Sequence, residues 1–261
     1  MFFFIVQKSK LRSHKHIYKM NRIFTLVILL AFTVKGFSLN DKIRIGLQFS
    51  PGVAWSKPFG KDLLQGKPRF GASYGFVLEY WFAKNYGLAT GIGGAFDGCN
   101  IHGRNIFEND TAGHQIRSVN EKYAFHYLEI PAYLKLKTNP IKGGKFIAWG
   151  QVGVTINITV SARANYSDSV PTTTGGKILI EKENILKQGN DVSKAIPSFW
   201  SNFIDVRLGA GAGFEYKFDE KTSLLVGLFY HNGFINNLFD HDVKKEPNVM
   251  RFMSLRVGVL F

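Results

Sequence analysis

The sequence predicts an all-β protein: an eight-stranded antiparallel up-and-down transmembrane β-barrel, preceded by an N-terminal signal peptide. Three observations predict this fold. Eight segments alternate apolar with small or polar residues, the gaps between them alternate long and short, and the chain ends on Phe261. The composition agrees, because Phe (24), Tyr (10) and Gly (27) are frequent and aromatic side chains suit a pleated sheet.

The net charge of +14 is concentrated at the N-terminus. Residues 1–38 contain seven basic residues and no acidic one, which leaves 26 basic against 19 acidic residues in the rest of the chain. A nucleic-acid-binding protein would cluster its basic residues, and here they are interspersed with acids. We therefore expect no nucleic-acid partner. The single cysteine, Cys99, excludes an internal disulfide.

The N-terminal region has the order of an export signal. A short basic segment at Met20-Asn21-Arg22 precedes an apolar run over 23–34, and Gly36-Phe37-Ser38 supplies small residues for cleavage. The run is too short to span a membrane as a helix. We assign residues 1–38 to the signal peptide region, with Met20 as an alternative true start, and 39–261 to the barrel domain. An uncleaved anchor is the alternative interpretation.

The eight segments alternate as strands do when one face is apolar. They span residues 42–49, 70–82, 86–96, 123–136, 146–162, 204–218, 222–230 and 249–261. Long gaps are expected at 50–69, 97–122, 163–203 and 231–248, and short ones at 83–85, 137–145 and 219–221. This rhythm is typical of a barrel with tight periplasmic turns, long outward loops and both termini in the periplasm.

The two faces of these segments differ in chemistry, and the apolar face is expected to meet lipid. Eight strands enclose only a narrow interior, which suits the face of small and polar residues. Aromatic residues beside the short gaps predict an interfacial girdle formed by Tyr80, Trp81, Phe82, Tyr86, Phe146, Trp149, Tyr216 and Phe218. The last segment ends on Phe261, the expected signal to the outer-membrane assembly machinery.

The segments contain Lys42-Ile-Arg-Ile-Gly-Leu, Tyr74-Gly-Phe-Val-Leu-Glu-Tyr80, Tyr127-Leu-Glu-Ile-Pro131, Leu134-Lys-Leu-Lys-Thr-Asn139, Gly150-Gln-Val-Gly153, Leu208-Gly-Ala-Gly-Ala-Gly213-Phe-Glu-Tyr and Ser254-Leu-Arg-Val-Gly-Val-Leu-Phe261. This set shows a resemblance to a known family, the PorT-like outer-membrane β-barrel proteins of the Bacteroidota. It implies an eight-stranded barrel in the cell outer membrane. It does not imply the founding member's role in type IX secretion.

Charged residues on the inner face predict a structural ion-pair network in the lumen, since buried charges must be paired or solvated. Its members are Glu79, Glu129, Lys135, Asp205, Arg207, Glu215 and Arg256. A gated ion path is the alternative interpretation. Pro131 predicts a bulge or kink in its strand, because proline cannot donate a ladder hydrogen bond.

The other candidate residues do not predict a catalytic, cofactor-binding or metal site. Asp97, Cys99, His102 and His114 are loosely spaced in one expected loop, which is weak evidence for a metal. The glycines of 91–94 and 209–213 resemble nucleotide loops but lack the strand-to-helix context, so we expect them to fit side chains into a tight lumen. His126 and His231 are the candidates for a lipid-modifying enzyme, and neither has a nucleophile at convincing spacing.

The sequence therefore favours a porin-like, non-catalytic barrel with a structural, surface-interaction or export-accessory role. The alternatives are a narrow ion or solute channel and an outer-membrane lipid-modifying enzyme. Expected partners are outer-membrane lipid, the assembly machinery through the C-terminal strand, and an unidentified protein at the extracellular loops. No cofactor is expected.

Overall fold

A computed structural model describes residues 42–58, 63–107, 115–141, 144–169, 177–186, 199–240 and 248–261. The predicted signal peptide region lies outside these residues. No helix in the described part of the chain is long and apolar enough to cross a membrane.

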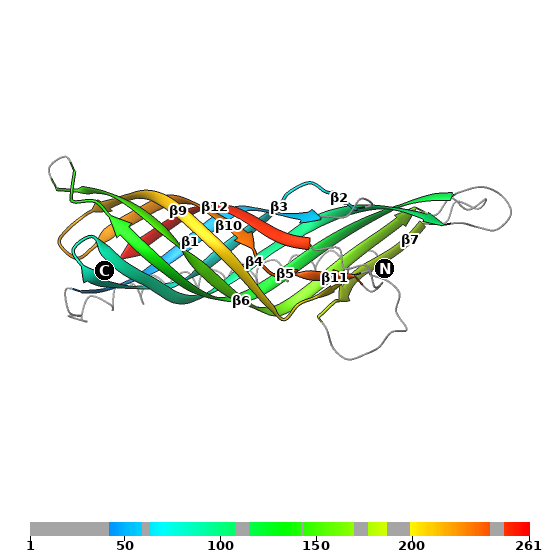
Figure 1. Cartoon of the computed structure of the whole chain (residues 1–261), viewed down its shortest axis with the longest axis horizontal. Coiled ribbons are helices and arrows are strands. Elements are labelled where there is room, and N and C mark those ends of the chain that lie inside the picture. The colour runs from blue at the N-terminus through cyan, green and yellow to red at the C-terminus, as the bar shows by residue number, and fades with distance from the viewer. Residues whose placement is uncertain are drawn as a thin grey trace, which may run out of the picture. The chain divides into compact units, whose positions relative to one another are not determined.

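Eight antiparallel strands close into a barrel, which confirms the predicted fold (Figure 1). They are β1 (Ile43–Pro58), β3 (Arg69–Ala83), β4 (Tyr86–Phe107), β5 (Gln115–Lys137), β6 (Phe146–Ser169), β9 (Ile204–Lys217), β10 (Ser223–Gly233) and β12 (Asn248–Leu260). Neighbours around the barrel follow the order β4-β3-β1-β12-β10-β9-β6-β5, and the pairing of β4 with β5 closes the ring. We call the end with the β3–β4, β5–β6 and β9–β10 connections the turn side, and the opposite end the loop side.

The predicted long gaps contain more strand than expected. β4 and β5 remain paired as far as Phe107 and Gln115, and β6 continues to Ser169. Their alternation weakens there, but each strand still satisfies the backbone groups of its neighbour, so the sheet continues. Four short strands also lie in these gaps: β2 (Leu63–Gln65), β7 (Lys177–Asn184), β8 (Phe199–Ser201) and β11 (Leu238–Asp240). β2 pairs with β4 and β7 with β6, while β8 and β11 pair with each other.

The apolar face points outward, as predicted. Large side chains such as Phe76, Phe214 and Leu255 are exposed, at 50%, 63% and 44%. The predicted aromatic girdle is wrong at two positions, because Trp81 and Trp149 are buried. Each occupies the inner phase of its strand, so its ring points into the barrel while its neighbours point outward.

The interior also holds larger side chains than the expected small and polar face. Glycines on β9 provide the room for them. A Cβ atom at Gly211 would lie 2.7 Å from the ring of Phe229, and one at Gly209 would lie 2.4 Å from Tyr133 Oη. These glycines therefore accommodate interior rings, as the sequence suggested for a tight lumen.

The bulge expected at Pro131 lies elsewhere. Pro131 stays in register with Thr155 of β6, although the pairings of Gly91 and Ile92 with β5 are absent. The register instead shifts between Tyr127 and His126, which leaves Val160 as an extra residue of β6. Pro131 interrupts the β4–β5 ladder without displacing the strands.

Candidate functional site: the barrel interior

Charged side chains from four strands meet inside the turn side of the barrel. Arg44 Nη2 lies 2.7 Å from Glu215 Oε1, and Arg44 Nη1 lies 3.8 Å from Glu79 Oε2. Lys135 Nζ forms an ion pair with Glu79 Oε1, and Arg44 also donates to Ser223 Oγ. We call Arg44, Glu79, Lys135 and Glu215 the turn-side ion cluster. It links β1, β3, β5 and β9 across the lumen, with two positive and two negative charges.

A second group of charges lies nearer the loop side. Arg207 of β9 forms ion pairs of 2.5 Å with Asp205 Oδ2 and with Asp97 Oδ2 of β4. The guanidinium carbon also lies 4.9 Å from the ring centroid of Tyr127, a cation–π contact. All three charged side chains are buried. We call Asp97, Asp205 and Arg207 the arginine cluster.

An aromatic layer separates the two clusters. It consists of Tyr133, Trp149, Phe229 and His231, whose rings contact one another. Tyr133 Oη lies 3.0 Å from His231 Nε2 and 2.5 Å from Thr155 Oγ1. The Arg256 guanidinium carbon lies 3.5 Å from the Phe229 ring centroid. Ring packing therefore fills the middle of the lumen.

Two small cavities flank Arg256 beside this layer. The larger is lined by residues that include Glu79, Lys135 and Gln151. The smaller is lined by residues that include Glu129 and His231. Both are bounded by Gln48, Pro131 and Arg256. Charged and polar side chains thus line part of the space beside the aromatic layer.

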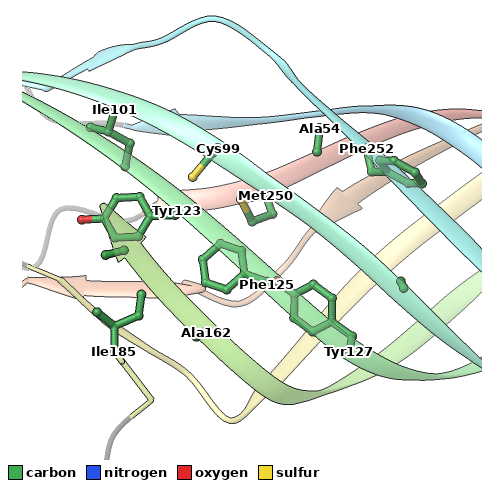
Figure 2. Close-up of a cluster of buried hydrophobic side chains, with 12 residues drawn as sticks. Ala54, Cys99, Ile101, Tyr123, Phe125, Tyr127, Ala162, Ile185, Met250 and Phe252 are labelled. Carbon is green, nitrogen blue, oxygen red and sulfur yellow. The ribbon is translucent and has the colours of Figure 1, made fainter. Parts of the chain in front are cut away.

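An apolar core fills the loop side, as Figure 2 shows. Its members are Ala54, Ala95, Cys99, Ile101, Tyr123, Phe125, Tyr127, Ala162, Ala164, Ile185, Met250 and Phe252. Phe125 stacks on Tyr123 and Tyr127, with centroid separations of 6.4 and 5.9 Å. We call this set the loop-side core.

Chain segments from the long connections are folded onto this core. Asn237 Nδ2 donates to Tyr127 Oη at 2.8 Å, and its backbone oxygen accepts from Asn202 N at 2.9 Å. Ile185 packs into the core and its N–H donates to Ala162 O at 3.1 Å. The loop side therefore has the packing of a soluble protein core.

The seven predicted lumen residues lie on the inner face, but they do not form one network. Glu79, Lys135 and Glu215 belong to the turn-side ion cluster, and Asp205 and Arg207 to the arginine cluster. Glu129 and Arg256 instead border the smaller cavity.

Sequence reasoning missed two members of these clusters, Arg44 and Asp97. Arg44 alternates with Ile43 and Ile45, which is the signal that could have found it. The sequence predicts a loop at Asp97 because the alternation weakens after Phe96, but β4 continues to Phe107.

The weak metal candidates do not converge. Asp97 and Cys99 point into the barrel from β4, whereas His102 is exposed and its Nδ1 contacts Asn120 Oδ1. His114 lies outside the described residues. Among the side chains that the structure describes, no three metal-ligating residues come together.

The two candidate histidines lie on opposite faces of the wall. His231 is buried within the aromatic layer, away from lipid. His126 faces outward, with its ring centroid 6.3 Å from that of Phe96. The pair therefore cannot act on a single substrate group.

The family model described as "Outer membrane protein beta-barrel domain" matches residues 33–240. The chain belongs to this family. Outer-membrane barrels close their sheet so that no strand edge meets hydrocarbon, as this chain does. The match places this outer-membrane barrel in the cell outer membrane.

Three solved structures are similar to this outer-membrane barrel. Neisserial surface protein A is 12% identical, with a TM-score of 0.39, over 83% of this chain and 97% of that chain. Ail, the attachment invasion locus protein of Yersinia pestis, is 13% identical (TM-score 0.31; 84% and 98% covered). OprG of Pseudomonas aeruginosa is 10% identical (TM-score 0.34; 83% and 95% covered). No curated protein matches this chain in sequence.

Proposed function

We propose that this outer-membrane barrel neither conducts solutes nor catalyses a reaction, and that it presents its extended strands at the cell surface for interaction. The observation that carries the proposal is the occupied interior. The turn-side ion cluster, the aromatic layer, the arginine cluster and the loop-side core follow one another along the lumen. Such an interior serves stability and leaves the outer surface to carry function.

The length of three strands supports the surface role. A transmembrane strand needs about 9–11 residues. β4, β5 and β6 have 22, 23 and 24 residues, whereas β9, β10 and β12 have 14, 11 and 13. Figure 1 shows β4–β7 continuing past the ends of the shorter strands. The extra length forms a rigid sheet beyond the apolar belt, a better binding platform than a mobile loop.

The proposed orientation places the turn side and both ends of the mature chain in the periplasm. Short turns on the periplasmic side and long connections outside are the rule for such barrels. An epitope inserted in the 108–114 connection should be labelled by antibody on intact cells. The same epitope at 219–221 should be labelled only after the outer membrane is opened. Reversed labelling would contradict the orientation.

Conductance in planar bilayers tests the closed lumen. The wild-type barrel should give no current steps while showing the heat-modifiable mobility of a folded barrel. The channel alternative, favoured by the two cavities beside Arg256, predicts steps whose size or selectivity changes in Arg207→Ala or Glu129→Ala. Wild-type current that either substitution alters would establish the channel and overturn the closed lumen.

The proposal has three further parts. The chain is a PorT-like barrel, it binds an unidentified protein at its loop side, and the outer-membrane assembly machinery recognises Phe261. Phe261 directly follows β12, whose outward residues Leu255 and Val257 are exposed. Phe261→Ala should reduce the amount of folded barrel in the outer membrane. The isolated variant should still refold in detergent, because the substitution removes a signal and no interior contact.

A further inference from the structure

Two basic side chains stand next to each other on the outer surface of the loop side. Lys122 of β5 is paired with Asn165 of β6, and Ala124 of β5 is paired with Arg163. Lys122 and Arg163 are therefore diagonal neighbours on one face of adjacent strands. Both are exposed, while the residues that alternate with them, Tyr123 and Ala164, are buried inside. The two charges thus point away from the barrel.

Their surroundings offer no counter-charge among the described side chains. Among the acidic side chains that the structure describes, the three near this end, Asp97, Glu121 and Asp205, are buried in the interior. The exposed acids whose side chains the structure describes, Asp219 and Glu220, lie in the β9–β10 turn at the opposite end. Like charges side by side on a sheet lower its stability, so this arrangement favours an external anion.

The position of the pair indicates what the anion is. Along β5 and β6 the outward side chains below it are apolar, including Leu128, Ile130, Ile156 and Val160, the last 66% exposed. Phe70, Phe96 and His126 form a rim of rings between this belt and the pair. Lys122 precedes His126 by four residues, about 13 Å along the strand. The two charges therefore lie at the depth of lipid headgroups.

We propose that Lys122 and Arg163 bind the phosphate of a lipid whose acyl chains lie on the apolar belt of β5 and β6. The arginine can hold phosphate oxygens with a planar fork, and the lysine adds a point charge. A soluble phosphate would contact only the two charged side chains, whereas a lipid would also contact the apolar belt beneath them. In the proposed orientation this lipid belongs to the outer leaflet.

A second basic pair lies on the same end of the barrel. Trp55 of β1 is paired with Arg251 of β12, so Lys57 is a diagonal neighbour of Arg251. Arg251 Nε donates to Asn232 Oδ1 at 3.0 Å, and Trp55 contacts Tyr230 just below. This pair repeats the arrangement of a basic residue above an aromatic one on a different part of the wall.

Native mass spectrometry of the purified barrel tests the site. The probes are diphosphorylated lipid A and the same lipid without phosphate, each in mixed detergent micelles. The wild-type barrel should retain the phosphorylated lipid preferentially. The double variant Lys122→Gln/Arg163→Gln should bind it about thirtyfold more weakly, given a typical contribution per basic residue near a membrane surface. The matched control Lys84→Gln/Lys145→Gln removes two exposed charges on the turn side and should behave as wild type.

Three further outcomes decide the proposal. Lys122→Arg/Arg163→Lys keeps the charges and should retain most of the binding. Equal retention by the wild type and the glutamine variant would overturn the site. Displacement of the lipid by an equal concentration of acyl-free glucosamine phosphate would assign the pair to a soluble anion instead. Unchanged heat-modifiable mobility verifies that each variant is folded, and the symmetric micelle makes the result independent of the proposed orientation and of the closed lumen.

Discussion

The two halves of the interior solve the same packing problem in different ways. On the turn side, Arg44, Glu79, Lys135 and Glu215 pair across the lumen, and the glycines of β9 admit the rings of the aromatic layer. On the loop side, Phe125 and its neighbours form an apolar core completed by Ile185 from a connecting segment. The turn-side half is held by strands alone, whereas the loop-side half also needs its connections.

The difference predicts how each half of the barrel should respond when its contacts are removed by mutation. The Arg44–Glu215 and Lys135–Glu79 ion pairs join strands that are not neighbours in the barrel, so their loss affects the whole ring. Loop-side contacts join the strand extensions to segments beyond them, so their loss should open that end locally. Four substitutions test this difference, beginning with the largest expected effect.

Glu79→Ala should destabilise the whole barrel by about 3–5 kcal/mol, because it leaves Lys135 buried without its carboxylate. Urea unfolding in micelles, followed by tryptophan fluorescence, measures the change. Glu220→Ala, at the exposed β9–β10 turn, is the control and should have little effect. Glu79→Leu/Lys135→Met should recover most of the loss. A change below about 1 kcal/mol for Glu79→Ala would show that the turn-side ion cluster does not hold the barrel.

Phe125→Ala should cost about 3 kcal/mol, confined to the loop side, because it removes a fully buried ring from the core. Protease cleavage of the loop-side connections should become about a hundredfold faster, while the main urea transition stays in place. Exposed Phe146→Ala on the turn side is the control. If Phe125→Ala lowered the urea midpoint of the main transition as much as Glu79→Ala does, the two halves would unfold together.

Gly211→Ala should destabilise the barrel by about 1–3 kcal/mol, because the added methyl group meets the Phe229 ring. Gly150→Ala, on the neighbouring strand, is the matched control, since its Cβ would meet only Gly211 O at 3.8 Å. Phe229→Leu should relieve part of the cost of Gly211→Ala in urea unfolding. Equal effects of the two glycine substitutions would exclude ring packing as the reason for glycine at 211.

Asn237→Ala should have the smallest effect, about 1 kcal/mol, because it removes the hydrogen bond to Tyr127 Oη. Cleavage of the 241–247 connection should become roughly fivefold faster. Tyr127→Phe removes the same bond from the other side, and the double variant should add little to either single change. Fully additive effects would indicate that the two side chains act separately.

The candidate site was predictable in part. Inward charges such as Glu79 and Arg207 are identifiable from sequence because they alternate with outward apolar residues within a regular strand. Their division into two clusters is not, because it depends on which residues meet across the lumen, and strands β1 and β9 are far apart in the sequence. The position of Trp149 beside a turn predicts an outward side chain, yet the phase of β6 points it inward.

The sequence by itself determined the strand number, the outward apolar face and the closed barrel, because alternation with period two fixes which face meets lipid. Only the tertiary structure decided how far β4, β5 and β6 extend, since backbone pairing continues without a strong side-chain pattern. It also decided which charges pair and which rings fill the lumen. Those contacts follow from the register around a closed ring, and local sequence carries no information about that register.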